Sequence, residues 1–131
     1  MNGKYLLDTN TVIAFLRNDE EIVEKIKEQA EVYIPVTVIG ELYFGAFKSK
    51  KREENLQKIS NLMKDIIVLD NNVQTARIYG EIKNRLKEKG KPIPENDIWI
   101  ASIAKQYDLL LMTTDLHFEE IENLKLYSSY S

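Results

Sequence analysis

The sequence predicts an α/β fold in which a parallel β-sheet is flanked by helices on both faces. Short apolar runs alternate with longer helical patterns along the whole chain, the order typical of parallel strands joined by crossover helices. The apolar runs contain few polar residues, as expected of strands buried on both faces. A length of 131 residues fits one compact domain, so we expect residues 1–131 to form a single unit.

The predicted strands are these short apolar runs. The first reads "KYLL" and the third reads "IIVL", and an aspartate follows each of them directly. The fourth, within "LLLM", precedes the polar segment "TTD", and a short fifth strand comes last. The five predicted strands cover residues 4–7, 32–34, 66–69, 109–112 and 125–127.

The predicted helices begin at polar residues that can accept hydrogen bonds from free backbone N–H groups. Pro35 lies at or near the start of the third helix, and Gly90 ends the long fifth helix. The expected N-caps are Asn10, Asn18 or Asp19, Asn71 or Asn72, and Asn96. The predicted helices cover residues 11–17, 19–30, 35–48, 53–63, 72–86, 97–106 and 117–121.

Composition excludes several kinds of site. The chain has no cysteine and one histidine, so disulfides, thiolate zinc sites, cysteine nucleophiles and histidine-rich metal sites are ruled out. Any metal would be held by oxygen, which favours Mg²⁺, Mn²⁺ or Ca²⁺ over zinc. The net charge of −3 argues against binding nucleic acid through bulk charge. No signal-peptide core or membrane span is apparent, so we expect a cytoplasmic protein.

Four acidic residues carry the functional prediction: Asp8, Glu41, Asp97 and Asp115. Asp8 and Asp115 follow predicted strands and Asp97 begins a predicted helix, so all three are expected at the carboxyl edge of the sheet. Glu41 lies about two turns into its helix and would have to reach inward along the helix face. Carboxylates gathered in one pocket repel each other unless a cation neutralises them. The arrangement predicts one or two divalent ions and metal-assisted hydrolysis of a phosphodiester.

These acidic residues lie in segments that resemble the PIN-domain nucleases of the VapC toxin type. The matching segments are "LLDTN", the "GE" of the third helix, "NDIWIASIA" and "TTDLHF", in family order over nearly the full length. The resemblance implies a PIN-like fold and a Mg²⁺- or Mn²⁺-dependent endoribonuclease that acts on tRNA or single-stranded RNA. It also implies a homodimer and a cognate antitoxin that silences the enzyme as one half of a toxin–antitoxin pair.

The resemblance also assigns roles to individual residues. It implies that Asp8, Glu41, Asp97 and Asp115 bind the metal and that Thr113 lines the site. Asn10 would orient Asp8 as well as cap its helix. Thr114 and Asp115 compete for the register of the fourth motif. His117 is expected to be a surface or packing residue rather than a general base, because metal-bound water needs no histidine.

Basic and aromatic residues suggest where partners would bind. Lys50, Lys51 and Arg52 form either a solvated loop or a contact with RNA phosphates. Tyr43, Phe44 and Phe47 crowd one helix, where any apolar surface left outside the core would suit an antitoxin helix or a second copy of the chain.

Two other functions compete with the nuclease. A phosphotransferase with Asp8 as nucleophile, as in haloacid-dehalogenase-like phosphatases, would usually need a second aspartate where this chain has Asn10. A PIN-like binding subunit without catalysis would be favoured by loss of one of the four acids, and all four are present. Asp70 and Glu95 are expected to be plain turn or cap acids.

Overall fold

A computed structural model describes residues 4–28 and 31–127 of the chain. The five strands are β1 (Lys4–Leu7), β2 (Glu31–Pro35), β3 (Ile67–Leu69), β4 (Leu110–Met112) and β5 (Leu126–Tyr127). The helices are α1 (Thr9–Leu16), α2 (Glu20–Lys27), α3 (Val36–Lys48), α4 (Arg52–Leu62), α5 (Val73–Lys89), α6 (Glu95–Gln106) and the 3-10 helix η1 (Leu116–Glu120).

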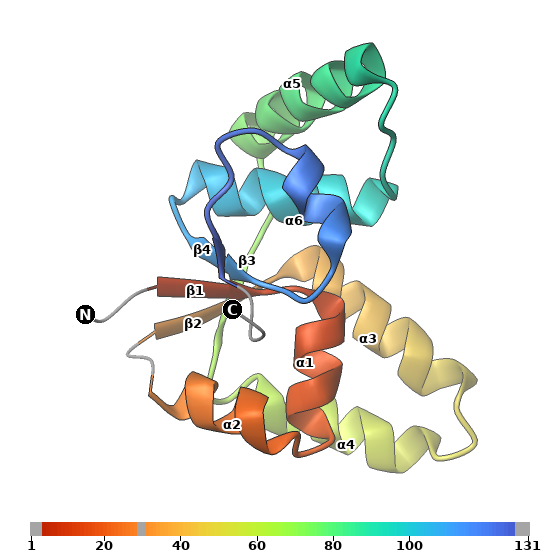
Figure 1. The fold of residues 1–131 in the computed structure, drawn as a ribbon. Coiled ribbons are helices and arrows are strands. Elements are labelled where there is room, and N and C mark those ends of the chain that lie inside the picture. The colour runs from red at the N-terminus through yellow and green to blue at the C-terminus, as the bar shows by residue number, and fades with distance from the viewer. Residues whose placement is uncertain (1–3, 29–30, 128–131) are drawn as a thin grey trace.

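The strands form one parallel sheet in the order β3-β2-β1-β4-β5. From β1 the chain moves outward through β2 to β3 and then crosses back to β4, on the other side of β1. Because parallel crossovers are almost always right-handed, a reversal of direction puts the later helices on the opposite face. Figure 1 shows this arrangement, with α5 and α6 on one side of the sheet and α1, α2 and α4 on the other. The predicted α/β architecture is confirmed.

The central strands are buried because helices cover both faces. Leu6 and Leu7 of β1, Ile34 of β2 and Leu111 of β4 are fully buried. They belong to one hydrophobic core that also contains Ile103 of α6. These are the residues of the apolar runs in the sequence, so the core was predictable from pattern alone.

The starts of two helices differ from the prediction. Asp8 rather than Asn10 caps α1, since its carboxylate accepts the backbone N–H of Thr11 and the helix therefore begins at Thr9. α6 begins at Glu95, directly after Pro94, so Asn96 is a helical residue in the first turn rather than its cap. The strand-ending aspartate and the fixed backbone of proline each start the helix before the asparagine is reached.

The remaining helix caps follow the sequence more closely. Asp19 caps α2 and Asn72 caps α5, in each case one of the two residues expected. Gly90 ends α5 with a left-handed backbone at φ 69°, a conformation that glycine adopts without a steric cost. The predicted second helix included residues 29–30, which lie outside the described residues. Within the described part of the chain, no helix combines the length and apolar character that crossing a bilayer requires.

Candidate functional site

Asp8 stands at the point where the sheet order reverses, between the carboxyl ends of β1 and β4. Its side chain is only 3% exposed. One carboxylate oxygen accepts the N–H of Thr11 at 2.9 Å, and the other accepts the hydroxyl of Thr113 at 2.5 Å. A carboxylate has about four lone-pair positions, so each oxygen keeps acceptor capacity after these two bonds. Asp8 is therefore held in a fixed orientation and can still bind a cation.

The segment after β4 is tied to the same point. Thr113 is buried, and its hydroxyl oxygen accepts the backbone N–H of Asp115 at 2.9 Å while it donates to Asp8. The Thr11 hydroxyl donates to the carbonyl of Met112 at 2.9 Å, which joins the start of α1 to the end of β4. Thr114 is exposed and Asp115 is half-buried, and the assignment of Asp115 to the fourth motif stays a prediction.

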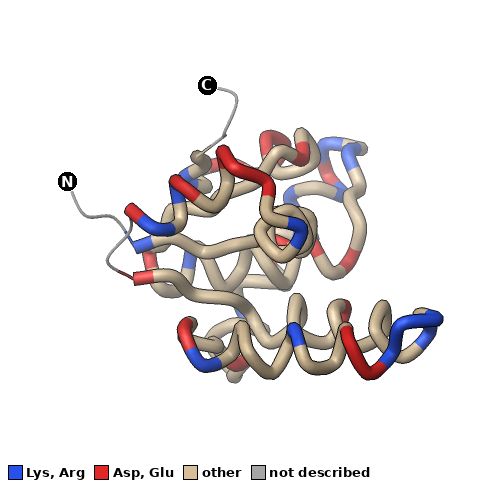
Figure 2. The backbone as a smooth tube through the Cα atoms, turned by 90° about the horizontal axis from the view of Figure 1, so that it is seen from below, with Lys and Arg blue, Asp and Glu red and all other residues tan. Residues whose placement is uncertain are grey.

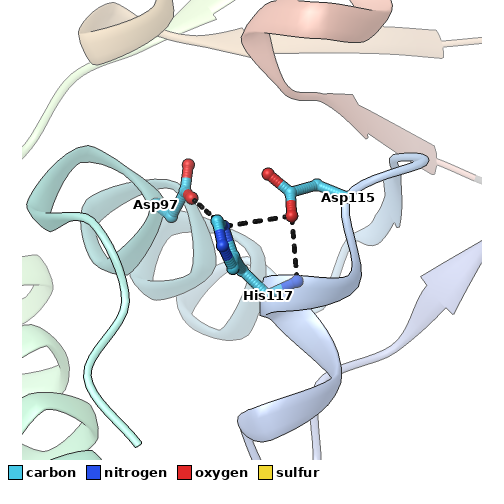
Figure 3. Close-up of side chains that lie close together, drawn as sticks. All are labelled: Asp97, Asp115 and His117. Atoms are coloured by element: carbon cyan, nitrogen blue, oxygen red, sulfur yellow. Dashed lines mark hydrogen bonds and ion pairs between the residues drawn. The ribbon is translucent and has the colours of Figure 1, made fainter.

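Asp97, Asp115 and His117 bring their polar atoms together (Figure 3). Asp97 comes from the first turn of α6, and the other two come from the end of β4 and from η1. The Nδ1 atom of His117 lies 3.0 Å from Asp115 Oδ1 and 3.4 Å from Asp97 Oδ2. One ligand atom from each residue can be chosen so that all three lie within 4.8 Å of one another. Three residues distant in the sequence thus offer a compact set of donors.

Burial and neighbouring acids raise the pKa of Asp97 above its ordinary value. The largest cause is desolvation, the next is the negative charge of Asp115, and Asp8 adds a smaller effect. His117 opposes the shift through its hydrogen bond and charge. The carboxyl groups of Asp8, Asp97 and Asp115 therefore share one electrostatic environment, as predicted for acids that converge at one sheet edge.

Glu41 reaches inward from α3, as the metal-ligand role requires of a residue two turns into a helix. Its carboxylate accepts the hydroxyl of Thr9 at 2.6 Å, and Thr9 is the residue next to Asp8. Among the described residues, the group of closely spaced donor atoms consists of Asp97, Asp115 and His117 and does not include Glu41. The structure brings Glu41 to the start of α1, and its role as a metal ligand stays a prediction.

Asn10 and the basic residues of the turn after α3 lie on the surface. Asn10 is exposed, and within residues 4–28 and 31–127 the recorded hydrogen bonds of Asp8 come from Thr11 and Thr113 rather than from Asn10. Lys50, Lys51 and Arg52 are exposed in the turn between α3 and α4. Figure 2 shows basic and acidic positions interspersed over the whole backbone, so charge is not segregated to one side.

Arg52 has a structural contact of its own. Its Nε and Nη2 atoms donate to the carbonyl of Phe47 at 3.0 and 2.8 Å, near the C-terminal end of α3. The last carbonyls of a helix lack partners within the helix, and a guanidinium there also complements the helix dipole. Arg52 therefore stabilises the end of α3, and contacts of Lys50 and Lys51 with RNA stay a prediction.

His117 is the site residue that reasoning from the sequence set aside. Its backbone N–H donates to Asp115 Oδ1 at 2.9 Å, and the fully buried Phe118 beside it anchors η1 in the core. The signal in the sequence was that Asp115 and His117 are two residues apart in the segment after β4, a spacing that allows their side chains to meet. That spacing does not say which way the histidine points, so only the tertiary structure could place it beside Asp97.

The donor set as a whole fits a divalent cation. Carboxylates from Asp97 and Asp115 gather with one imidazole, and the carboxylate of Asp8 lies near enough to act on the pKa of Asp97. Both hard and borderline divalent ions accept such ligands. When bound, the ion would lower the pKa of a coordinated water and neutralise charge on a phosphate. The site lies at the carboxyl ends of β1 and β4, the edge at which open α/β sheets bind their ligands.

Among known protein families, the PIN domain matches residues 5–124 of this chain. The chain belongs to the PIN-domain family. Among curated relatives of this PIN domain, Ribonuclease VapC2 of Haemophilus influenzae is 36% identical over 93% of the chain and 95% of the relative. The tRNA(fMet)-specific endonuclease VapC of Salmonella typhimurium is 33% identical over 94% and 96%, respectively. The resemblance to VapC proteins inferred from the sequence motifs is confirmed.

Solved structures give the same family. The DNA-bound VapBC complex of Salmonella typhimurium contains a chain that matches this PIN domain with a TM-score of 0.91 and 32% identity, covering 98% of this chain and 99% of that one. A chain of the promoter-bound VapBC2 complex of Rickettsia felis matches with a TM-score of 0.89 and 28% identity, over 95% and 98% of the two chains. The VapC-like fold thus extends over nearly the whole chain.

Proposed function

We propose that this VapC-like PIN domain is a metal-dependent endoribonuclease and the toxin of a toxin–antitoxin pair. The observation that carries the proposal is the convergence of Asp8, Asp97 and Asp115 at the reversal point of the sheet. The names of the relatives support ribonuclease activity, and a tRNA endonuclease among them makes tRNA or single-stranded RNA the first substrate class to test. Mg²⁺ or Mn²⁺ is the proposed cofactor.

Each residue has a proposed task in hydrolysis. The carboxylate of Asp8 is held by Thr11 and Thr113, and that of Asp115 by the backbone N–H of His117, so little reorganisation is needed when the substrate binds. Asp97 faces them from α6, and Glu41 completes the acidic set from α3. An ion held by these residues would supply Lewis-acid stabilisation of the phosphate and would activate a water. Lys50 and Lys51, with Arg52 beside them, are proposed to contact RNA phosphates away from the cleaved bond.

The proposed partners follow from the relatives and from one exposed surface. The titles of the VapBC structures support a cognate antitoxin, and we propose a homodimer in the cytoplasm. On α3, Phe44 is 67% exposed and Phe47 is 53% exposed, while Leu42 and Ala46 of the same helix are buried. This aromatic surface, Phe44 and Phe47, is an apolar area left outside the core, and it suits an antitoxin helix or a second copy.

The deciding experiment is cleavage of pooled tRNA and single-stranded RNA by antitoxin-free protein with Mg²⁺, Mn²⁺ or EDTA. Asp8→Ala is the test variant. Asp70→Ala is the matched control, because Asp70 also follows an apolar strand, β3, but is exposed and lies after a strand at the sheet's edge. Defined cuts that EDTA and Asp8→Ala abolish, and Asp70→Ala does not, would support the proposal. Folded protein that cuts nothing would favour a binding subunit without catalysis.

A further inference from the structure

The acidic site contains one nitrogen donor in addition to its carboxylates. His117 Nδ1 lies between the two acids, 3.0 Å from Asp115 Oδ1 and 3.4 Å from Asp97 Oδ2 (Figure 3). His117 is the single histidine of the chain. A ring nitrogen placed between two carboxylates can be either a counter-ion or a ligand to the same cation, and the two roles predict opposite effects of its removal.

The spacing of the donors matches that of ligands around one ion. Two donors bonded to a first-row divalent ion at about 2.1 Å each are roughly 3 Å apart when they meet at a right angle and about 4.2 Å apart when opposite. The contacts of His117 with both carboxylates fall at the first of these separations. The three ligand atoms also lie within 4.8 Å of one another, so a small adjustment brings all three to one ion.

The local structure holds the imidazole in this position. The backbone N–H of His117 is bonded to the same oxygen, Asp115 Oδ1, that faces its ring. The next residue, Phe118, is fully buried and is among the largest fully buried side chains of the described chain. The chain is thereby held by Asp115 before His117 and by Phe118 after it, and His117 is directed at the site although its side chain is half exposed.

A nitrogen ligand changes which ion the site prefers. Mg²⁺ binds oxygen ligands and keeps most of its water, whereas imidazole suits first-row transition ions, whose affinity for mixed sites rises along the series from Mn²⁺. We propose that His117 is a direct ligand that, with Asp97 and Asp115, makes a mixed nitrogen–oxygen site selective for Mn²⁺ or a later transition ion over Mg²⁺. The inference rests on the metal site of the proposed function and narrows its cofactor.

The first test measures the equilibrium binding of Mn²⁺ and of Mg²⁺ to metal-free protein without RNA. Titration calorimetry gives the two affinities. We expect the unmodified protein to bind Mn²⁺ more tightly than Mg²⁺. His117→Gln keeps a polar side chain but removes the imidazole, and it should lower Mn²⁺ affinity by at least about tenfold while changing Mg²⁺ affinity little. Leu116→Gln is the matched control, because Leu116 is 73% exposed and belongs to the same short helix.

The second test detects the bond itself. In pulsed electron paramagnetic resonance, Mn²⁺ bound to the unmodified protein should show coupling to a ¹⁴N nucleus, and this coupling should be absent from Mn²⁺ bound to His117→Gln. An absence of nitrogen coupling in the unmodified protein would overturn the proposal. An equal or higher Mn²⁺ affinity in His117→Gln would overturn the proposal too. A histidine that acts only as counter-ion to the carboxylates competes with the metal, so its removal would not weaken metal binding.

A further variant separates this inference from the proposed function. Asp97→Ala should abolish tight binding of both ions if the acidic cluster is the metal site at all. If Mn²⁺ binding survives Asp97→Ala, the metal site of the proposed function is wrong, and the ligand role of His117 fails with it. If binding depends on Asp97 but is indifferent to His117, the metal site stands and only the ligand role of His117 is wrong.

Discussion

Thr113 is the residue that connects the two strand ends of the acidic site. Its hydroxyl donates to Asp8 and accepts the backbone N–H of Asp115, and the side chain is 4% exposed. Thr113→Val keeps the shape but removes both hydrogen bonds. We expect the free energy of unfolding to fall by about 1–3 kcal/mol, the usual result when a buried polar group loses its partner. Urea denaturation of metal-free protein measures this effect.

The adjacent threonine is the control for that substitution. Thr114 is exposed, and Thr114→Val should leave stability and metal binding close to those of the unmodified protein. Thr113→Val should also weaken metal binding, because Asp8 is no longer held at both oxygens. Equal effects of the two substitutions would contradict the role assigned to the Thr113 hydroxyl.

The ionised carboxylate of Asp97 lowers the stability of the metal-free folded protein relative to the protonated form. Its pKa is raised, first by burial and then by Asp115, so the ionised group opposes folding at any pH above the raised pKa. This penalty disappears as the pH falls through that pKa. In EDTA at pH 7, Asp97→Asn should therefore raise the Tm by a few degrees at most, since solvent partly screens the charge of a side chain that is 19% exposed. The gain should shrink toward pH 4.

Scanning calorimetry at several pH values measures the Asp97 effect. Asp70→Asn provides the comparison, because Asp70 is exposed and lies outside the acidic site. A lower Tm for Asp97→Asn at pH 7 would mean that the contact with His117 outweighs the repulsion from Asp115 and Asp8. Metal binding by Asp97→Asn should be lost whatever its stability.

At the scale of elements, the first turn of α5 supports α6, the helix that carries Asp97. Asn72 and Thr75 form a capping box, and the fully buried Thr75 hydroxyl also donates to Gln106 of α6 at 2.5 Å. Thr75→Val should lower the free energy of unfolding by about 1–2 kcal/mol. Thr75→Ser, which keeps the hydroxyl, should cost less. Chemical denaturation compares the two, and a loss for Thr75→Ser that equals or exceeds the loss for Thr75→Val would contradict the dominant role assigned to the hydroxyl.

The turn between α3 and α4 is the element proposed to contact RNA. Because Arg52 stabilises the end of α3, the clean test changes Lys50 and Lys51 to Ser and keeps Arg52. Each lost phosphate contact should reduce the slope of log affinity against log salt by about one. Filter binding over a salt series measures the slope. Lys64→Ser with Lys87→Ser, two exposed lysines elsewhere, is the control, and identical slopes would remove the turn from the RNA site.

On the scale of the whole molecule, the aromatic surface of α3 is the surface proposed to mediate association. Phe44 and Phe47 leave most of their side chains in water, an unusual cost for a helix that otherwise packs into the core. Phe44→Glu should convert the proposed homodimer to monomers, or weaken capture by the antitoxin if the antitoxin covers this surface. Analytical ultracentrifugation with and without antitoxin separates the two cases. Val73→Glu, at an 87% exposed site on α5, should change neither.

The order of the strands explains where the site lies. β1 and β4 are neighbours in the sheet, although more than one hundred residues separate Leu6 from its partner Leu111. The chain leaves β1 toward one edge and returns to β4 on the other side, so the segments that follow these two strands diverge at one point of the sheet edge. Asp8 and Asp115 therefore lie at the same point because of the topology of the fold, and α6 brings Asp97 to it.

The apolar runs by themselves determined the strands, the core and the sheet edge at which Asp8, Asp97 and Asp115 would meet. These features follow from periodicity and from the common direction of parallel strands, which are local properties of the sequence. The helix starts were less predictable, because Asp8 and Pro94 compete with Asn10 and Asn96 as caps and nearby asparagines look equally suitable. Local preference ranks such candidates without choosing among them.

Only the tertiary structure decided which way individual side chains point. The ring of His117 lies toward Asp97 and Asp115, and Thr113 bonds to both Asp8 and Asp115. Arg52 donates to a carbonyl at the end of α3. These contacts connect residues from different elements, and their geometry depends on how the elements pack rather than on the letters between them. The sequence therefore determined that an acidic site would form, whereas packing decided that a histidine would stand inside it.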